Sequence, residues 1–244
     1  MTEREKRSRG EKWKNKRAQS PGRGTLKQRV KTARRRSASS TNWLGRQLND
    51  PYVAAAKNAG YRSRAAFKLI QIDDRFGFLK RGGFVVDLGA APGGWTQVSV
   101  ERTSRVYKTD IPNVLAIDRD DMDPVTGARI VKMDVLAPDA PTLIKQYLSG
   151  DVRVVLSDMA APATGHRQTD HARVIALCET GLALAMDILA PGGTFVAKVL
   201  RGGTEHELLA EMKRHFGAVR HFKPQASRSD SAEIYVVATA FKGC

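Results

Sequence analysis

One stretch of the chain constrains its fold more than any other: the apolar run from Phe84 to Leu88, which leads into a glycine-rich loop. The run carries Asp87 near its end, the loop reads GAAPGG, and helix-compatible residues follow from Trp95 onward. This order predicts a strand, a tight turn and the N-terminus of a helix. Gly89 and Gly93 allow the backbone to turn sharply and approach a ligand closely, while the first amides of the helix face the same place. We therefore predict a cofactor-binding loop, with a tight turn that holds no ligand as the alternative.

The same stretch argues against a nicotinamide or flavin cofactor. Asp87 precedes the loop, Pro92 lies inside it, and the dinucleotide spacing G-x-G-x-x-G is missing.

The positive charge of the chain is concentrated at its N-terminal end. Lys and Arg number 41 against 25 Asp and Glu, a net charge of +16 over 244 residues, and residues 1–50 alone carry 16 basic and 4 acidic residues. Residues 1–50 show no sustained helical or alternating period, so we predict an arm that is disordered by itself and binds a polyanion through its phosphates. A solubilising tail is the alternative. Residues 51–244 are expected to form the catalytic domain.

Composition also narrows the expected location. Two cysteines, Cys178 and Cys244, can form neither a disulfide framework nor a zinc site, which favours a reducing compartment. No stretch approaches the roughly 20 apolar residues of a membrane span. We expect a cytoplasmic protein that binds no membrane and no metal.

The rest of the chain alternates helices and strands, which predicts an α/β sheet. Three further helices are expected. The first spans Arg62 to Phe76, the second is long and stops at residues 191–193, and the third starts at a capping box of Thr204 and Glu207. Strands are expected at 113–117, 129–133, 152–157, 194–199, 218–222 and 234–240. The connector from 223 to 232 is too short and polar for a crossover helix, so the last strand should be antiparallel.

Charged residues follow the apolar strands at the ends where α/β sheets bind ligands. They are Asp87, Asp118, Asp134, Asp158 and Lys198, and Glu233 joins them because a reversed strand begins where the parallel strands finish. A carboxylate such as Asp118 can accept hydrogen bonds from both hydroxyls of a ribose. Asp134 is expected either to accept from an adenine amino group or to cap the following segment. Lys198 interrupts an apolar strand, where a lysine is costly unless it is paired or neutral.

With these residues in place, the chain resembles the RlmE/RrmJ/FtsJ family of S-adenosylmethionine-dependent ribose 2'-O-methyltransferases. The resemblance runs from about Tyr61 to Phe241 and rests on five ordered motifs: RSRAAFKL at 62–69, DLGAAPGGW at 87–95, SDMA at 157–160, FVAKV at 195–199 and SAEIY at 231–235. It implies a seven-stranded, mostly parallel Rossmann-like sheet with helices on both faces. The family tetrad falls on Lys68, Asp158, Lys198 and Glu233. The resemblance implies cofactor contacts at Gly93, Trp95, Asp118, Asp134 and Asp158, to which the loop geometry adds Gly89.

The implied reaction is an in-line attack of a ribose 2'-hydroxyl on the methyl group of a sulfonium. We expect Lys198 to take the hydroxyl proton as a neutral amine, Asp158 and Glu233 to orient the lysines, and Lys68 to tune Lys198 or position the ribose. Much of the acceleration should come from holding the reacting groups in line, which needs no metal. Arg62 and Arg64, which by themselves add positive surface, are expected to bind RNA phosphates together with the arm.

The closest resemblance is to enzymes that modify a uridine in the A-loop of 23S ribosomal RNA, so we expect the large ribosomal subunit as partner and a monomeric enzyme. Two alternatives remain open: a methyltransferase that acts on transfer RNA or another RNA, and a noncatalytic RNA-binding factor with a degenerate cofactor site.

Overall fold

The computed structural model describes residues 29–104, 112–148, 150–162, 164–201 and 206–243. The chain forms two compact units, residues 1–60 and residues 61–244. The second unit therefore begins at Tyr61, later than the boundary at residue 51 that the sequence suggested.

The described part of residues 1–50, the predicted arm, forms helices. A 3-10 helix, η1, spans Ala33–Arg35, and α2 spans Ala38–Leu48. Ser37 caps α2 by accepting a hydrogen bond from the amide of Ser40 at 3.2 Å. A third helix, α3, spans Pro51–Ala59. Single side-chain caps, Ser37 for α2 and Asp50 for α3, start these helices, and such caps need no sustained hydrophobic period in the sequence. Residues 1–28 lie outside the described part of the chain.

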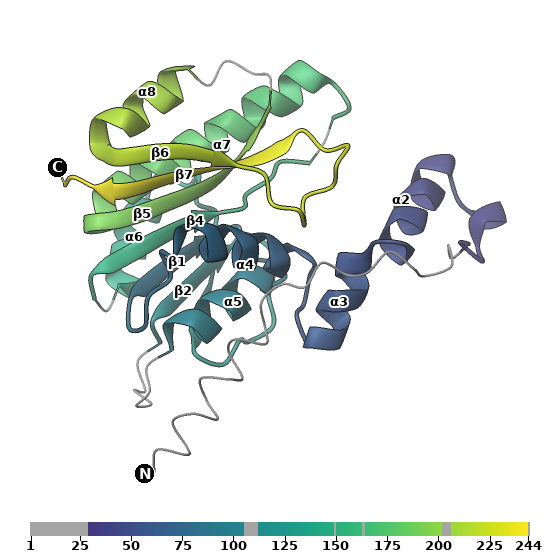
Figure 1. Ribbon diagram of the computed structural model, residues 1–244, viewed down its shortest axis with the longest axis horizontal. Coiled ribbons are helices and arrows are strands. Elements are labelled where there is room, and N and C mark those ends of the chain that lie inside the picture. The colour runs from purple at the N-terminus through teal and green to yellow at the C-terminus, as the bar shows by residue number, and fades with distance from the viewer. Residues whose placement is uncertain (1–28, 105–111, 149, 163, 202–205, 244) are drawn as a thin grey trace, which may run out of the picture. The chain divides into compact units, whose positions relative to one another are not determined.

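A seven-stranded sheet forms the centre of the second unit (Figure 1). The strands are β1 (Phe84–Leu88), β2 (Val114–Asp118), β3 (Ala128–Lys132), β4 (Val152–Ser157), β5 (Leu189–Leu200), β6 (Phe216–Phe222) and β7 (Glu233–Phe241). Their order is β3-β2-β1-β4-β5-β7-β6. The strands pair in parallel from β3 to β5, and β7 pairs antiparallel with both β5 and β6. The predicted sheet with a reversed last strand is confirmed.

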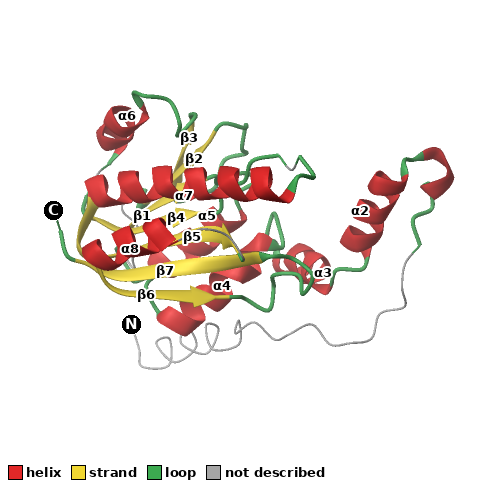
Figure 2. Cartoon of the chain, turned by 90° about the horizontal axis from the view of Figure 1, so that it is seen from above, coloured by secondary structure: helices red, strands yellow, loops and turns green. Residues whose placement is uncertain are grey.

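Helices cover both faces of the sheet (Figure 2). They are α4 (Ala65–Phe76) and α5 (Gly94–Thr103) on one face, and α6 (Ala140–Tyr147), α7 (Arg167–Ile188) and α8 (His206–His215) on the other. The central strand β1 is buried along its whole length, including Asp87. Its apolar side chains join those of β2, β4, β5 and β7 in the core.

Two details differ from the sequence expectation. The long helix α7 ends at Ile188, and β5 begins at Leu189, before the Pro191-Gly192-Gly193 segment. That segment forms an irregularity in β5, because Leu189 pairs with Val152 and Thr194 already pairs with Val154. Helix α6 was not predicted from the sequence, and the predicted capping residue Thr204 lies outside the described residues.

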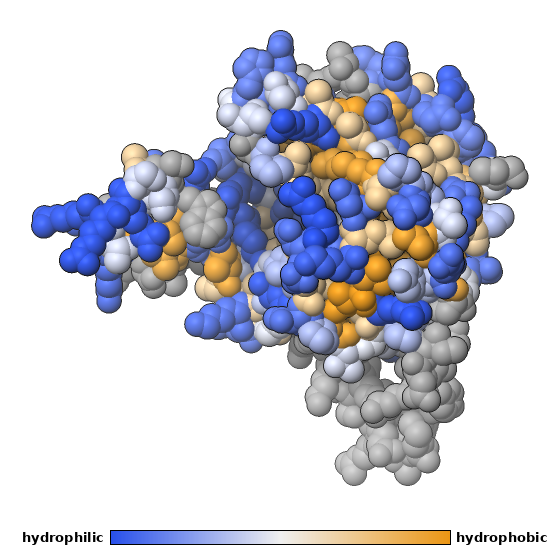
Figure 3. Space-filling model, turned by 180° about the vertical axis from the view of Figure 1, so that it is seen from behind, coloured by the Kyte–Doolittle hydropathy of each residue, from blue (hydrophilic) through white to orange (hydrophobic). Residues whose placement is uncertain are grey.

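The two units differ in surface character. Seen from behind, the second unit mixes hydrophilic residues with apolar areas, whereas hydrophilic residues dominate the described part of the first unit (Figure 3). Among the described helices, none combines the length and the apolar character needed to cross a bilayer.

Candidate active site

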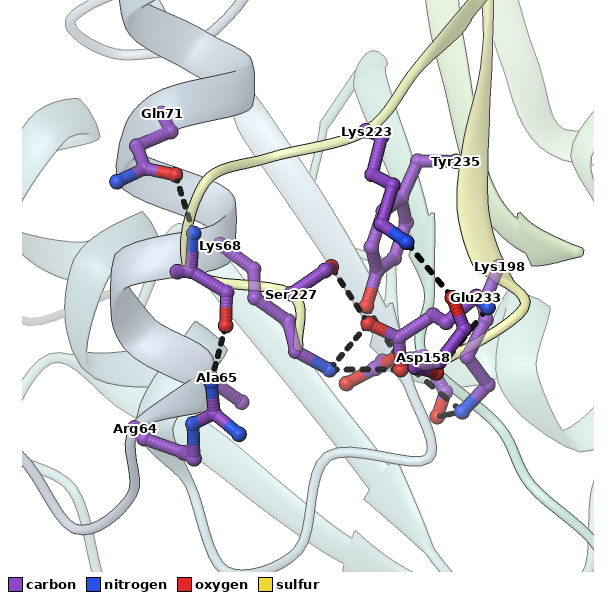
Figure 4. Close-up of polar contacts among 12 residues, drawn as sticks. Arg64, Ala65, Lys68, Gln71, Asp158, Lys198, Lys223, Ser227, Glu233 and Tyr235 are labelled. Carbon is purple, nitrogen blue, oxygen red and sulfur yellow. Dashed lines mark hydrogen bonds and ion pairs between the residues drawn. The ribbon is translucent and has the colours of Figure 1, made fainter. Parts of the chain in front are cut away.

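The site lies where the parallel strands end and β7 begins. Antiparallel pairing places Lys198 of β5 directly opposite Tyr235 of β7, and Leu200 opposite Glu233. Residues two apart on a strand share a face of the sheet, so Glu233 and Tyr235 project to the same side. The four residues of the predicted tetrad meet here: Lys68, Asp158, Lys198 and Glu233 lie close together at this edge (Figure 4).

Lys198 is paired with Asp158. Its Nζ lies 3.2 Å from Oδ1 of Asp158 and donates to the main-chain carbonyl of the same residue at 2.7 Å. The side chains of Lys198 and Asp158 are only 10% and 17% exposed, so water weakens this ion pair far less than it would at the surface. The pairing explains how a lysine is tolerated in the apolar strand β5.

Lys68 forms the second pair of the site. Its Nζ lies 2.8 Å from the Glu233 carboxylate, and Glu233 also accepts a hydrogen bond from the Ser227 hydroxyl at 2.7 Å. The side chain of Lys68 is only 12% exposed. Each lysine of the tetrad thus has its own carboxylate.

Tyr235 joins the two pairs and was missed by the sequence analysis. Its hydroxyl donates to Oδ1 of Asp158 at 2.9 Å, and the Nζ of Lys68 lies 5.7 Å from its ring centroid. Burial and the carboxylates of Asp158 and Glu233 raise the pKa of Tyr235 well above its ordinary value, so the hydroxyl remains a donor. The period of two in β7 could have identified it, because Tyr235 stands two residues after Glu233.

Asp158 stays ionised in this environment. Burial raises the pKa of its carboxyl, but the ammonium groups of Lys198 and Lys68 and the Tyr235 hydroxyl outweigh burial and hold the pKa below its usual range. The carboxylate therefore keeps its charge for the pairing with Lys198.

The connector between β6 and β7, residues 223–232, is attached to α4. The main-chain carbonyl of Ala226 accepts a hydrogen bond from Arg64, and its amide donates to Gln71 Oε1 at 2.9 Å. Ala226 and Ser227 are buried, and Ser227 reaches Glu233 from this connector (Figure 4). Arg64, predicted to bind phosphate, thus helps to hold the segment that contacts Glu233.

The glycine loop after β1 is packed against protein atoms. Gly89 and Gly93 have φ angles of 73° and 108°, which side-chain-bearing residues rarely adopt. A Cβ at Gly89 would lie 2.8 Å from Met159, and a Cβ at Gly93 would lie 2.8 Å from Arg62. The close approach that was expected for a ligand is made, at these two Cβ positions, by protein atoms: the main chain and side chain of Met159 and the side chain of Arg62.

Trp95 anchors the helix that follows the loop. It is 3% exposed, its indole N–H donates to the carbonyl of Ala65 at 2.8 Å, and its ring lies 5.5 Å from that of Tyr235. Its indole therefore joins α5 to α4 and contacts Tyr235. A cofactor contact at Trp95 stays a prediction.

Two of the carboxylates predicted to contact the cofactor, Asp118 and Asp134, lie at the ends of the neighbouring strands β2 and β3. Asp118 accepts hydrogen bonds from the amides of Ala91 and Asp120, each at 2.8 Å, and so ties the end of β2 to the glycine loop. Asp134 is exposed and accepts from the amide of Leu136 at 2.9 Å, a hydrogen bond to the turn that follows β3. A contact of Asp134 with adenine stays a prediction.

Asp87 is fully buried beneath this loop. Its Oδ2 accepts from the Thr96 hydroxyl at 2.7 Å, while Oδ1 is buried without a hydrogen-bond partner among the described residues. Burial raises the pKa of Asp87 to about 7. The negative charges of Asp158 and Asp118 add to this rise, and the Thr96 hydrogen bond opposes it.

These observations fit a positively charged nucleoside cofactor. Carboxylates stand at the ends of β1, β2 and β4, and the first amides of α5 face the same edge. Together with the reversed β7 and the two lysine–carboxylate pairs, the fold and site define a Rossmann-like S-adenosylmethionine-dependent methyltransferase.

Comparison with known proteins identifies the family. The chain belongs to the FtsJ-like methyltransferase family, which matches residues 61–241. A protein from Parvibaculum lavamentivorans named ribosomal RNA large subunit methyltransferase E is 60% identical over 91% of this chain and 89% of its own length. A protein of the same name from Paramagnetospirillum magneticum is 58% identical over 91% of each chain. A crystal structure described as a ribosomal RNA methyltransferase from Plasmodium falciparum superposes with a TM-score of 0.66 at 31% identity, covering 75% of this chain and 100% of that one.

Proposed function

We propose that this methyltransferase modifies the ribose 2'-hydroxyl of a uridine in 23S ribosomal RNA, in the A-loop of the assembled 50S subunit. The relatives named for large-subunit ribosomal RNA support the substrate, because they share more than half of their residues with this chain over about nine-tenths of its length. The tetrad supports the chemistry.

The position of Lys198 is the observation that carries the proposal. A neutral lysine amine has two N–H groups and one lone pair. In this site Asp158 offers two acceptors to Nζ, its carbonyl oxygen at 2.7 Å and its Oδ1 at 3.2 Å. When both N–H groups point to Asp158, the lone pair is left to accept the proton of a 2'-hydroxyl. Lys198 is therefore the proposed base.

The other members of the tetrad have supporting roles in the proposal. Asp158 orients Lys198 through these two contacts, and Tyr235 limits the rotation of the Asp158 carboxylate. Glu233 holds Lys68, which positions the ribose. S-adenosylmethionine, when bound, supplies an electrophilic methyl group on a sulfonium. Because the groups that orient the hydroxyl are set in advance, proximity should provide much of the rate.

The cofactor contacts proposed for this chain are at Gly89, Gly93, Trp95, Asp118 and Asp134, together with Asp158. Asp118 accepts one amide hydrogen bond at each oxygen, and a carboxylate oxygen can accept a second. It can therefore receive ribose hydroxyls without losing its hold on the glycine loop.

RNA binding is proposed for the basic arm of residues 1–50, which carries 16 of the 41 basic residues. The guanidinium groups of Arg62 and Arg64, which were expected to contact phosphates, donate to main-chain carbonyls. We propose a monomeric cytoplasmic enzyme, since its RNA partner is assembled into ribosomes there.

The test is incubation of the protein with isotopically labelled S-adenosylmethionine and undermethylated 50S subunits, with transfer RNA in parallel. The RNA is then digested to nucleosides. Label in 2'-O-methyluridine from the subunits, lost when the A-loop is already methylated, is the expected result.

Other outcomes distinguish the alternatives. Label in transfer RNA alone would keep the chemistry and replace the substrate. Normal cofactor binding without transfer to either RNA would contradict the proposed substrate and favour a noncatalytic RNA-binding factor.

A further inference from the structure

Arg62 lies just before α4, and its side chain is held by three main-chain carbonyls. Nη1 donates to Pro92 at 3.3 Å and to Asp123 at 2.7 Å, and Nη2 donates to Pro124 at 2.6 Å. These carbonyls belong to two separate segments, the glycine loop after β1 and the segment that follows β2. Three of the five N–H groups of the guanidinium are thus used to join two loops.

The main chain and the stem of Arg62 are fixed as well. The amide of Arg62 donates to Gln97 Oε1 at 2.9 Å, and Gln97 belongs to α5. A Cβ at Gly93 would lie 2.8 Å from Nη1 and 3.2 Å from Cδ of Arg62. The side chain therefore lies directly against Gly93, the residue that precedes the first turn of α5.

The two loops joined by Arg62 carry the two halves of the proposed cofactor site. The glycine loop presents Gly93 and the amides of α5, and the segment after β2 directly follows Asp118, the last residue of that strand. One direct contact between these halves is the hydrogen bond from the Ala91 amide to Asp118 at 2.8 Å. The amides of Gly89 and Ala90 also donate to the carbonyl of Ile117, at 2.9 and 3.1 Å. Arg62 adds a connection further along both segments, between Pro92 and the carbonyls of Asp123 and Pro124, and so helps to set the spacing of the halves.

We propose that Arg62 is a positioning residue for S-adenosylmethionine: it holds the glycine loop and the segment after β2 at the separation that the cofactor requires. The proposal rests on the placement of the cofactor in the proposed function. It replaces the role in RNA phosphate binding that the sequence suggested for Arg62.

The test measures cofactor affinity directly, by calorimetric titration of the full-length protein with S-adenosylmethionine and with S-adenosylhomocysteine. Arg62→Gln is expected to weaken binding about tenfold, the factor for losing roughly one charge-assisted hydrogen bond. Arg62→Lys, which keeps a charged donor but lacks the planar fork, should recover part of the loss. Arg81→Gln is the matched control, because Arg81 is exposed and precedes β1 at the opposite edge of the sheet.

Kinetics and RNA binding separate a positioning role from the alternatives. For Arg62→Gln we expect the KM for the cofactor to rise with its dissociation constant, kcat at saturating cofactor to stay within about twofold, and the salt dependence of RNA binding to be unchanged. If Arg62→Gln bound the cofactor as tightly as wild type and its RNA binding depended less steeply on salt, the proposal would be overturned. Arg62 would then be a phosphate-binding residue. If kcat at saturating cofactor fell by the same factor as the cofactor affinity, the proposal would be overturned in favour of a general structural role for Arg62. If the wild-type protein itself failed to bind the cofactor, the proposed function would fail instead.

Discussion

At the scale of single residues, Lys198 and Lys68 have different partners and therefore different expected effects. Lys198 pairs with Asp158, and Lys68 pairs with Glu233. Lys198→Gln keeps an amide that can donate to Asp158 but cannot take a proton. We expect it to lower kcat by about 10²- to 10⁴-fold, the range for loss of a general base, without changing cofactor affinity.

The control for this prediction is Lys145→Ala. It removes an exposed lysine of α6 that pairs with Asp187 of α7. Single-turnover transfer to 50S subunits and cofactor titration are the two measurements. Full transfer by Lys198→Gln would show that another group takes the proton.

The raised pKa of the buried Asp87 should make the stability of the protein depend on pH. An aspartate in an unfolded chain has a pKa near 3.9, whereas burial raises the pKa of Asp87 to about 7 in the folded protein. Between these values the folded state holds a proton that the unfolded chain lacks, so its stability falls as the pH rises and levels off above about 7. Asp87→Asn accepts the same hydrogen bond from Thr96 and has no such loss.

The measurement is urea unfolding of wild type and Asp87→Asn at pH 5 and pH 8. The variant should gain about 3 kcal/mol relative to wild type between these two pH values, an order-of-magnitude figure for two pH units. A constant difference between the two proteins would mean that Asp87 is ionised throughout.

At the scale of secondary-structure elements, the connector of residues 223–232 acts on the site through its attachment to α4. Ser227→Ala removes the hydrogen bond to Glu233 while leaving the contacts of Ala226 with Arg64 and Gln71 in place. Glu233 then loses one of its hydrogen-bond partners, and Lys68 is held less firmly. We expect kcat to fall about tenfold with unchanged cofactor affinity, as for loss of a hydrogen bond to a charged group.

Two variants in the same connector sharpen this prediction. Ser227→Thr keeps the hydroxyl and should restore most of the activity. Ser229→Ala changes an exposed serine two positions away and should behave as wild type. Equal activity of Ser227→Ala and wild type would mean that Glu233 does not need the Ser227 hydrogen bond to hold Lys68.

The strands of the sheet could be predicted from the sequence, whereas the attachment of the 223–232 connector to α4 could not. The strands were predictable because buried strands are continuous apolar runs, and the charged residues that end them mark the ligand edge. The attachment of Ala226 to Arg64 and Gln71 was not predictable, because it joins residues 162 and 155 positions apart. The same limit applies to the arginines of the RSRAAFKL motif, which were predicted to bind RNA phosphates. A sequence shows their positive charge, but it does not show the main-chain carbonyls to which they donate.

At the scale of the whole molecule, charge is distributed unevenly between the arm and the rest of the chain. Of the net charge of +16, residues 1–50 contribute 12 and the remaining residues only 4. The described part of the arm includes Arg34, Arg35 and Arg36, which stand together at the end of η1 and before α2. Such a cluster displaces counterions from a phosphate backbone, and the resulting affinity depends steeply on salt.

Neutralising this cluster tests whether the arm itself contacts RNA. In the triple variant Arg34→Gln, Arg35→Gln, Arg36→Gln, the slope of log affinity against log salt should become shallower by about two to three, since each lost phosphate contact contributes about 0.7 to 0.9. Cofactor affinity should not change. The matched control is Lys80→Gln, Arg81→Gln, Lys213→Gln, which removes the same charge from exposed positions before β1 and β6, at the edge of the sheet opposite the site. If both variants changed the slope equally, RNA binding would follow net charge alone, and the arm would have no contact of its own.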